Sequence, residues 1–371
     1  MPHRLTPLAA SLPATVPFTG PEALERAQGH PFAARLGANE SRFGPSPAAV
    51  AAMTRAAADA WMYGDPDMHD LRRAIAAHHG CDPAHVMPGQ GIDSLLGLIV
   101  RLTVTAGTPV VTSAGAYPTF AFHVIGFGGV LHAVPYTADH EDPERLVARA
   151  RAVGARLIYF ANPDNPMGTW HDAATVQRMV DAVPDDCLLL LDEAYVELAP
   201  PGTAAAIDPA DPRVIRLRTF SKAHGLAGLR VGYAIGPAPL IGAFDRVRDH
   251  FGLGRVAQAG ALAALADREW VIAVRARVAT ARDRIAAIGR ENGLFPLPSA
   301  TNFVTLDCGA DGALARATLA GLRNRGVFIR MPGVAPLDRC IRISCGTDAD
   351  LDLLATALPG ALTQARAMTG M

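Results

Sequence analysis

Short apolar segments alternate with alanine-rich helical stretches from Pro47 onward, and this order constrains the fold more than any other feature. The apolar segments have the length of strands and lie at 109–112, 157–160, 188–191 and 214–217. When a helix separates each strand from the next, the connections are right-handed crossovers and the strands run parallel. The sequence therefore predicts an α/β fold with a mostly parallel sheet that is flanked by helices.

The 371 residues are enough for one or two complete cores, and this length favours two domains. Residues 1–35 begin with a proline-rich, weakly periodic stretch, which predicts an N-terminal arm. Residues 36–255 are the predicted large domain, and a helix near 245–255 is expected to lead out of it. Residues 256–371 are a predicted smaller α+β domain, joined by part of the N-terminal segment. Its expected elements are a helix over 268–292 and strands over 302–307, 327–330 and 340–344.

Composition and charge argue against several classes of protein. The net charge is −1 without basic clusters, which argues against a nucleic-acid-binding protein. No apolar run of membrane-spanning length and no cleavable signal is visible, so we expect a cytoplasmic protein without membrane contact. The five cysteines are odd in number and lack a paired spacing, which predicts reduced thiols that pack. The histidines lack ligand spacing, so no metal is predicted, and His79, His123 and His224 are expected to be packing or surface residues.

A lysine stands among small hydroxyl residues in Thr219-Phe-Ser221-Lys222, and Arg230 follows eight positions later. A lysine amine forms a reversible imine with a carbonyl cofactor. Hydroxyl groups, backbone N–H groups and a forked guanidinium are the usual donors to a phosphate. The segment predicts that Lys222 binds an aldehyde cofactor that also carries a phosphate. The alternative is a solvated surface lysine.

A run of leucines, 188–191, ends in Asp192, and Tyr195 follows it. Such a run is typical of a buried parallel strand, and open α/β sheets bind ligands outside the carboxyl ends of these strands. A carboxylate there would keep a pyridine nitrogen protonated, and Tyr195 would reach the ring oxygen. The alternative is that Asp192 caps the next helix and that Tyr195 packs.

Another apolar strand, 156–160, runs into Asn-Pro-Asp-Asn165-Pro-Met-Gly. Two Asn-Pro steps and a glycine make a rigid turn, because proline fixes φ and restrains the residue before it. The turn would hold the Asn165 amide against a phenolate oxygen of the cofactor. An ordinary loop is the alternative.

A glycine-rich turn that contains Gly91, Ile92 and Asp93 precedes an amphipathic helical stretch. Glycines let the backbone approach an anion, and the N–H groups and the positive end of the helix then face that anion. The three residues are therefore candidate phosphate donors, although such a pattern is more often only a turn. Tyr117 would stack on a cofactor ring or, as a lone aromatic residue, belong to the core.

Together these motifs indicate pyridoxal 5′-phosphate as the cofactor. With Leu36-Gly-Ala-Asn39-Glu40 ahead of them and Arg342-Ile-Ser-Cys-Gly346 behind them, the chain resembles the aspartate aminotransferase superfamily, fold type I of the pyridoxal-phosphate enzymes. Within it, about residues 36–350 resemble the histidinol-phosphate aminotransferase branch. The resemblance implies a seven-stranded sheet in the large domain. It also implies ping-pong transfer of an amino group between an amino acid, or an amino-alcohol phosphate such as histidinol phosphate, and a 2-oxo acid.

The resemblance further implies a role for each residue of the site. The implied cofactor-binding residues are Gly91, Ile92, Asp93, Tyr117, Asn165, Asp192, Tyr195, Thr219, Ser221, Lys222, Arg230 and, from the neighbouring subunit of a homodimer, Tyr63. The implied catalytic residues are Lys222, Asp192, Tyr195 and Asn165. Arg342 is expected to bind the substrate carboxylate and Asn39 to lie at the substrate. Arg330 would bind a second anionic group or be an exposed structural arginine.

The chain departs from the branch around the expected substrate. It has Asp93-Ser94 where an acidic pair is usual, Pro-Met-Gly after Asn165 where Pro-Thr-Gly is common, and Ser-Arg-Phe at 41–43 where Asn-Pro-Tyr is common. The reaction class is therefore more firmly indicated than the substrate. Two other classes stay open, because the same fold supports decarboxylases and lyases similar to threonine-phosphate decarboxylase and also effector-sensing domains of regulators. No basic DNA-binding module of such a regulator is visible in the sequence.

Overall fold

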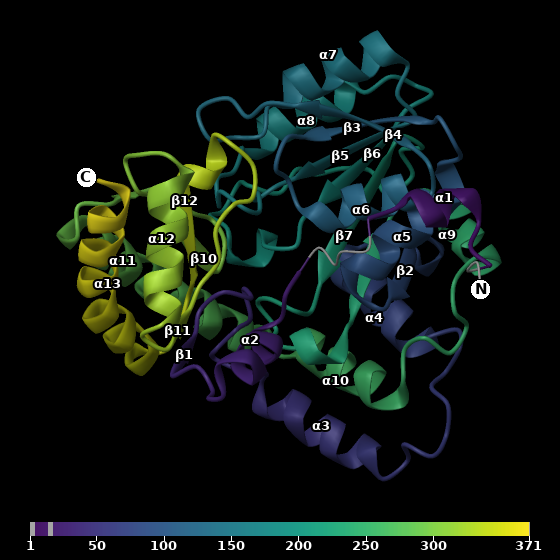
Figure 1. Ribbon diagram of the computed structural model, residues 1–371. Coiled ribbons are helices and arrows are strands. Elements are labelled where there is room, and N and C mark those ends of the chain that lie inside the picture. Colours follow the sequence, from purple (N-terminus) through teal and green to yellow (C-terminus); the bar gives the residue numbers. More distant parts are fainter. Residues whose placement is uncertain (1–3, 14–17, 371) are drawn as a thin grey trace.

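The computed structural model describes residues 4–13 and 18–370, and its centre is a seven-stranded sheet in the order β2-β8-β7-β6-β5-β3-β4 (Figure 1). The strands are β2 (Val86–Gly89), β3 (Pro109–Ser113), β4 (Val130–Val134), β5 (Leu157–Ala161), β6 (Leu188–Asp192), β7 (Val214–Thr219) and β8 (Gly232–Ile235). β8 runs antiparallel to both of its neighbours, and the other pairs are parallel. The α/β prediction and its four strands are confirmed, and β2, β4 and β8 are further strands that the sequence did not predict.

Helices cover both faces of this sheet because alternate residues of each buried strand point to opposite sides. In β5, Leu157 and Tyr159 belong to a core on one face, and Ile158 and Phe160 belong to a core on the other. The first core contains residues of α4 (His69–His79), α5 (Gly91–Thr103), α6 (Pro118–Gly126), α9 (Ala238–Ala243) and α10 (Arg255–Ala266). The second contains residues of α7 (Pro143–Val153) and α8 (Ala173–Ala182). Figure 1 shows these two helix layers on either side of the blue and teal strands.

Side-chain caps set the starts of several helices. Ser46 Oγ accepts a hydrogen bond from Ala49 N at the start of α3 (Pro47–Ala57). Asp142 and Asp172 do the same for α7 and α8. These residues satisfy N–H groups that have no partner inside the helix, so the chain turns from loop to helix at defined points.

A second core lies among the C-terminal elements, drawn in green and yellow in Figure 1. Strands β9 (Phe295–Pro296), β10 (Phe303–Asp307) and β12 (Cys340–Ser344) form an antiparallel sheet with β10 in the middle. This sheet packs with α11 (Arg268–Glu291), α12 (Gly312–Arg323) and α13 (Asp348–Thr369). The smaller α+β unit therefore forms largely as its expected helix and strands indicate.

The N-terminal arm contains two short helices, α1 (Pro7–Ser11) and α2 (Pro21–Gln28). Residues 1–3 and 14–17 of the predicted arm lie outside the described part of the chain. After α2, β1 (Ala34–Arg35) pairs in parallel with β11 (Val327–Phe328), and Ala34 and Leu36 enter the C-terminal core. The N-terminal segment thus packs with the smaller unit.

The prediction of a helix near 245–255 is wrong. A single 3-10 turn, Phe244–Arg246, is followed by a loop, and α10 begins only at Arg255. Gly252 and Gly254 lie in this loop, and glycine disfavours a continuous helix there. The division of the chain at residues 35 and 255 stays a prediction, but α10 packs on α3 and α4 beside the large sheet rather than on the smaller unit.

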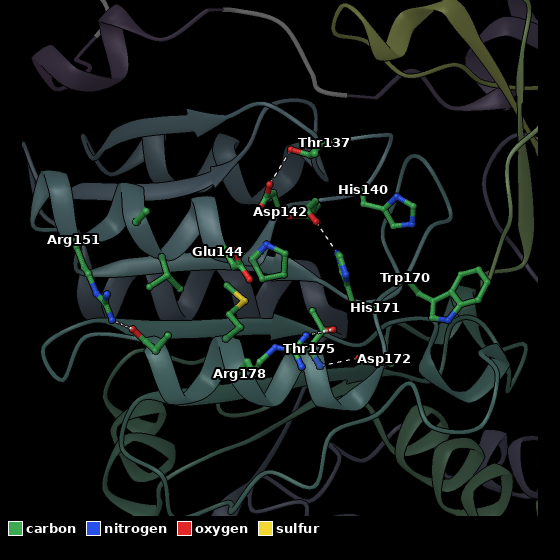
Figure 2. A pocket seen from close by; sticks show the side chains of 16 residues that line it. Thr137, His140, Asp142, Glu144, Arg151, Trp170, His171, Asp172, Thr175 and Arg178 are labelled. Atoms are coloured by element: carbon green, nitrogen blue, oxygen red, sulfur yellow. Dashed lines mark hydrogen bonds between the residues drawn. The ribbon is translucent and has the colours of Figure 1, made fainter.

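Helices α7 and α8 leave a cavity of about 810 Å³ between them (Figure 2). It is bounded at one end by Trp170 and His171. None of the helices in the described part of the chain combines the length and the apolar character that a membrane span requires.

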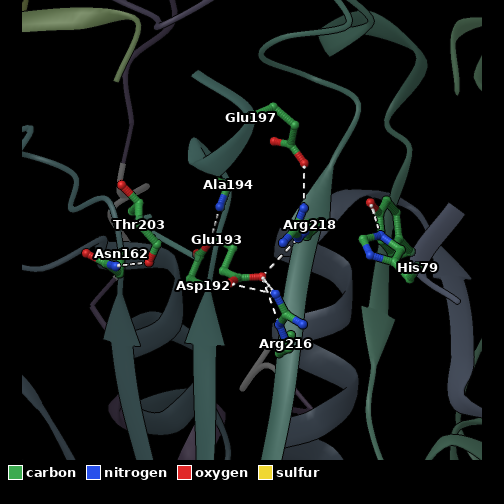
Figure 3. Close-up of polar contacts among 10 residues, drawn as sticks. His79, Asn162, Asp192, Glu193, Ala194, Glu197, Thr203, Arg216 and Arg218 are labelled. Carbon is green, nitrogen blue, oxygen red and sulfur yellow. Dashed lines mark hydrogen bonds and ion pairs between the residues drawn. The ribbon is translucent and has the colours of Figure 1, made fainter. Parts of the chain in front are cut away.

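A network of nearly buried ion pairs joins the ends of β6 and β7 (Figure 3). Glu193, whose side chain is 2% exposed, lies 3.0 Å from Arg216 Nη2 and 2.9 Å from Arg218 Nε. Arg218 Nη1 also lies 3.3 Å from Glu197 Oε1. Because Glu193 directly follows Asp192, the network fixes the backbone where β6 ends.

Replacement of Glu193 by glutamine removes the charge that two nearly buried guanidinium groups share. Because the loss of one partner leaves buried charges uncompensated, we expect Glu193→Gln to lower the free energy of unfolding by about 3–5 kcal/mol. Urea denaturation followed by circular dichroism measures this. As a control, Asp352→Asn removes a partner of Arg284 at an exposed pair and should cost less than about 1 kcal/mol. Equal losses in the two variants would contradict the assigned role of the network.

Candidate active site

A cavity of about 630 Å³ lies at the carboxyl ends of β5, β6 and β7, between the large sheet and the C-terminal unit. Of the predicted site residues, the structure brings together around it Asn39, Ile92, Asp93, Tyr117, Asn165, Asp192, Tyr195, Thr219, Ser221, Lys222, Arg230, Arg330 and Arg342. Gly91, which precedes Ile92 in the chain, does not line the cavity, and Tyr63 is exposed and does not line it either. The larger cavity between α7 and α8 is lined by none of the predicted residues. We therefore place the candidate active site in the smaller cavity.

Lys222 is the only lysine among the 34 Lys and Arg residues of the chain. Its amine lines the cavity and donates a hydrogen bond to the backbone oxygen of Asn39 at 2.9 Å. Loss of solvent, and then the positive charges of Arg342 and Arg230, lower the pKa of Lys222 to about 8. A larger share of the amine is therefore uncharged near neutral pH than in an ordinary lysine. An uncharged amine is a nucleophile and a proton acceptor.

Asp192 is the last residue of β6 and is 5% exposed. Its Oδ2 accepts a hydrogen bond from the Tyr159 hydroxyl at 2.7 Å, and its Oδ1 accepts one from Ala194 N at 3.0 Å. Burial raises the pKa of Asp192 to about 6, while these two hydrogen bonds oppose the rise. A cation against this carboxyl group would keep it ionised.

The N-terminus of α5 and the Arg230 guanidinium form one end of the site. Gly91 has φ +75°, and a Cβ atom there would lie 2.5 Å from Arg230 Nη2, so the site requires glycine. Arg230 Nη1 donates to Ser221 Oγ at 3.3 Å, and Nη2 lies 3.4 Å from Asp93 Oδ2. The Thr219 hydroxyl donates to Ser221 Oγ at 2.9 Å. A helix N-terminus, two hydroxyl groups and a guanidinium together favour an anion such as a phosphate.

Tyr117 directly precedes α6, and its hydroxyl donates to Asp93 Oδ1 at 2.8 Å. The Phe18 ring stacks at 5.9 Å from the Tyr117 ring and also lines the cavity. Arg330 Nη2 donates to the backbone oxygen of Thr19 at 2.8 Å, and its guanidinium lies 5.3 Å from the Phe18 ring. The N-terminal arm thus reaches the site.

Two arginines, Arg330 and Arg342, line the same cavity. The backbones of Arg330 and Arg342 form an antiparallel β-bridge. Arg342 Nη1 donates to Asn165 Oδ1, whereas Arg342 Nε is buried without a hydrogen-bond partner among the described residues. Loss of solvent lowers the pKa of Arg342 to about 10 and lowers that of Arg330. A buried cation with a free N–H group favours an anionic ligand.

Asn39 connects the two halves of the site. It is 3% exposed and has φ +54°. Its Nδ2 donates to the Tyr195 hydroxyl at 3.1 Å, its Oδ1 accepts from Ser344 Oγ at 3.0 Å, and its backbone oxygen accepts from Lys222. These contacts tie the segment after β1 to the lysine and to β12. Substrate binding by Asn39 stays a prediction.

Tyr63 does not face the cavity of its own chain. It is 76% exposed, and its ring lies 4.7 Å from the ring of Phe251. Its predicted place in a neighbouring subunit stays a prediction.

The sequence did not indicate Phe18 or Tyr159 as site residues. Tyr159 lies on the same face of β5 as Leu157, and its hydroxyl was the available signal, since a polar group inside a buried strand needs a partner. Phe18 had no such signal, because its segment is weakly periodic.

The lowered pKa of Lys222 has a direct chemical consequence. In cofactor-free protein, an acylating reagent should modify Lys222 at a rate that rises with pH through about 8, rather than through the ordinary 10.5, because only the uncharged amine reacts. Since Lys222 is the only lysine, peptide mass spectrometry distinguishes it from the terminal amine without ambiguity. A rate that rises only above pH 10 would contradict the loss of solvation at this amine.

Residues 34–358 match the model of the family described as aminotransferase class I and II. A histidinol-phosphate aminotransferase of Jannaschia sp. is 37% identical over 324 residues, which cover 87% of this chain and 89% of that protein. A histidinol-phosphate aminotransferase of Anaeromyxobacter sp. is 37% identical over 347 residues, which cover 92% of this chain and 94% of that protein.

Solved structures agree with this. The histidinol-phosphate aminotransferase from Sinorhizobium meliloti, in complex with pyridoxal-5′-phosphate, is 53% identical with a TM-score of 0.94, over 97% of this chain and 98% of that chain. The predicted fold type I architecture and the predicted resemblance to the histidinol-phosphate branch are confirmed. The chain belongs to the class I and II aminotransferases.

Proposed function

We propose that this aminotransferase uses pyridoxal 5′-phosphate to move an amino group between an amino acid, or an amino-alcohol phosphate such as histidinol phosphate, and a 2-oxo acid by a ping-pong mechanism. The observation that carries the proposal is the position of Lys222. The only lysine of the chain lines the cavity, with a lowered pKa, together with an aspartate at a strand end and an anion site. The relatives named above favour this reaction over the decarboxylase or lyase alternative.

The residues of the cavity fit this cofactor. Arg230, Ser221 and the N-terminus of α5 would hold its phosphate, because they offer donors and positive charge. Asp192 would face the ring nitrogen. The positive charge of that nitrogen would lower the pKa of Asp192 from its raised value. Tyr117 would lie on a face of the ring. When bound, the cofactor supplies a positively charged ring that withdraws electrons from the substrate α-carbon.

Lys222 and Asp192 would have different roles in the reaction. Once its amine is free, Lys222 would accept the proton from the substrate α-carbon and pass it to the cofactor, which its pKa of about 8 favours. Asp192 would stay ionised and stabilise the positive charge of the ring. Tyr195 and Asn165 line the same cavity as Lys222. Both would donate hydrogen bonds to the ring oxygen of the cofactor.

Arg342 and Arg330 would bind the anionic part of the substrate. Arg342 Nε has no hydrogen-bond partner among the described residues, so a carboxylate or phosphate oxygen would complete it. Two arginines with paired backbones line the cavity and suit a dianion, which supports a phosphate-bearing substrate. The names of the relatives point the same way.

We further propose a homodimer in which Tyr63 reaches the neighbouring site. Trp61, Tyr63 and Phe251 are large apolar side chains with 81%, 76% and 53% exposure. Apolar groups that lie this close together on a surface favour contact with another protein surface. Arg255 Nη2 donates to the backbone oxygen of Tyr63 at 3.0 Å and so supports this segment. A cytoplasmic location, which the free thiols support, is part of the same proposal.

Lys222→Ala should lower kcat by roughly 1000-fold or more, because both the covalent link and the general base are lost. Some pyridoxal phosphate should remain bound without a covalent bond. Stopped-flow absorbance with histidinol phosphate, aromatic amino acids and 2-oxoglutarate measures both half-reactions. Lys222→Arg is the matched control, since it keeps the charge and should be equally inactive.

Borohydride should fix the cofactor on the peptide that carries Lys222 in the wild type and on no peptide of either variant. A label elsewhere, or near-normal turnover by Lys222→Ala, would contradict the proposal. Release of carbon dioxide in place of a 2-oxo product would favour the decarboxylase alternative.

Mixed dimers test the role of Tyr63. If each site takes Lys222 from one subunit and Tyr63 from the other, remixed Lys222→Ala and Tyr63→Ala chains should regain about one quarter of the wild-type sites, since a symmetric dimer has two equivalent sites. The control mixes Lys222→Ala with Asp192→Ala, whose residues share one site, and should regain nothing. Equal activity of the two mixtures would place Tyr63 outside the neighbouring site.

A further inference from the structure

An arginine of the C-terminal unit binds a loop of the large sheet. Arg339 Nε lies 2.7 Å from Asp307 Oδ2, and Arg339 Nη2 donates to both carboxylate oxygens of Asp139, at 2.9 and 2.8 Å. Asp307 ends β10 in the C-terminal unit, whereas Asp139 lies in the connection from β4 to α7. The three side chains are only 21–28% exposed, and none of them lines the cavity of the candidate site. We call these three residues the Arg339 clamp.

The loop on the large-sheet side has a backbone that needs support. Ala138 and Asp139 have φ of +47° and +63°, in the left-handed region that disfavours residues with a side chain. Thr137 and His140, which flank them and are labelled in Figure 2, pair through backbone hydrogen bonds of 2.9 and 3.0 Å. Such a conformation persists only where surrounding contacts hold it. The contacts between the Asp139 carboxylate and Arg339 supply this support.

The same loop contacts the turn that carries Asn165. The backbone oxygen of Asp139 accepts a hydrogen bond from Thr169 Oγ1 at 2.8 Å. Thr169 closes the turn, because its backbone oxygen accepts a hydrogen bond from Asp164 N at 2.9 Å. Asp139 is therefore bound to the Asn165 turn through its backbone and to Arg339 through its side chain.

Arg339 leads to the other partner of Asn165. It directly precedes β12, the strand that carries Arg342. Arg342 Nη1 donates to Asn165 Oδ1, so this contact also joins β12 to the Asn165 turn. The clamp and the contact between Arg342 and Asn165 therefore connect the same two segments of the chain. Only the second contact belongs to the cavity, since Asn165 and Arg342 line it.

The segment before Arg339 forms part of the cavity wall. Residues 331–334 line the cavity, and Arg339 Nη1 donates to the backbone oxygen of Pro336 at 3.0 Å. Leu337, which is 1% exposed, packs in a small core with Met167 of the Asn165 turn. Arg339 therefore supports this part of the wall as well as the start of β12.

We propose that the Arg339 clamp positions Arg342 for the anionic group of the substrate. Arg342 Nε has no hydrogen-bond partner among the described residues, and an anion binds most tightly to a donor that is already in place. The clamp holds β12 at the Asn165 turn independently of that anion. Arg339 and Asp139 are positioning residues, because neither lines the cavity. The inference rests on the proposed function only for the nature of the substrate.

Maleate tests the clamp without catalysis, because this dicarboxylate has no amino group to transfer. Isothermal titration calorimetry of the protein loaded with pyridoxal phosphate measures both the Kd and the number of sites. We expect Arg339→Ala and Asp139→Ala each to raise the Kd at least about tenfold, because a small misplacement of a binding group weakens its contacts. The double variant should lie within about twofold of the weaker single variant, since the two residues act as one unit.

Arg316→Ala is the matched control. Arg316 Nη1 lies 3.1 Å from Asp338 Oδ2, so it pairs with the residue next to Arg339 but stays within the C-terminal unit. This variant should keep the Kd for maleate within about twofold of wild type. A clamp that only stabilises the fold would lower the number of sites and leave the Kd unchanged. That result, or equal effects of Arg316→Ala and Arg339→Ala on the Kd, would overturn the proposal.

Asp139→Asn covers the case in which the alanine variants do not fold, which thermal melting reports. Asparagine tolerates positive φ, so this variant keeps the backbone of the loop and removes only the charge. It should raise the Kd for maleate at least about fivefold, because the charge-assisted hydrogen bonds to Arg339 are lost. A Kd within about twofold of wild type would contradict the positioning role.

The outcomes separate this inference from the proposed function. If the wild type binds maleate but shows no transamination, the proposed function fails and the calorimetric comparison still decides the role of the clamp. If the wild type catalyses transamination but does not bind maleate, the proposed function stands and the inference fails, since Arg342 is then not an anion site that the clamp positions.

Discussion

Loss of solvent at the carboxyl edge of the mostly parallel sheet controls the chemistry of Lys222, Asp192 and Arg342. The same physical cause lowers the pKa of Lys222 to about 8 and raises that of Asp192 to about 6. Both shifts favour the uncharged form, so each group is poised to change state when a ligand supplies the missing charge. The parallel sheet makes this possible, because its strand ends are buried under helices and under the C-terminal unit while their side chains converge on one cavity.

The site depends equally on connections between distant parts of the chain. Asn39 follows β1, yet its backbone oxygen accepts from Lys222 and its side chain contacts Tyr195 and Ser344. Asn39 therefore contacts both the amine of Lys222 and β12, the strand that carries Arg342.

The sequence predicted the fold and the cavity residues to the extent that each rests on local pattern. The apolar segments predicted β3, β5, β6 and β7. The aspartate at the end of one strand and the Asn-Pro turn after another predicted Asp192 and Asn165 as site residues, and both line the cavity. The number of lysines is a further strong signal in the sequence. Because Lys222 is the only lysine, an imine with a lysine can form only there. Phe18 could not be predicted, because its role comes from contact with a residue far along the chain and its segment has no distinctive pattern. The loop before α10 differs from the expected helix because Gly252 and Gly254 disfavour a continuous helix there.

Two carboxylates near the site show why residue type alone does not define a role. Glu193 and Glu141 are both glutamates with almost no exposure, and both lie at strand ends of one sheet. Glu193 faces two guanidinium groups, which lower its pKa, so it is an ionised structural partner. The Glu141 carboxyl group accepts hydrogen bonds from Ser113 Oγ and Ala161 N, and burial raises its pKa well above the ordinary value. The partners that tertiary structure places around a buried glutamate therefore decide the direction of its pKa shift.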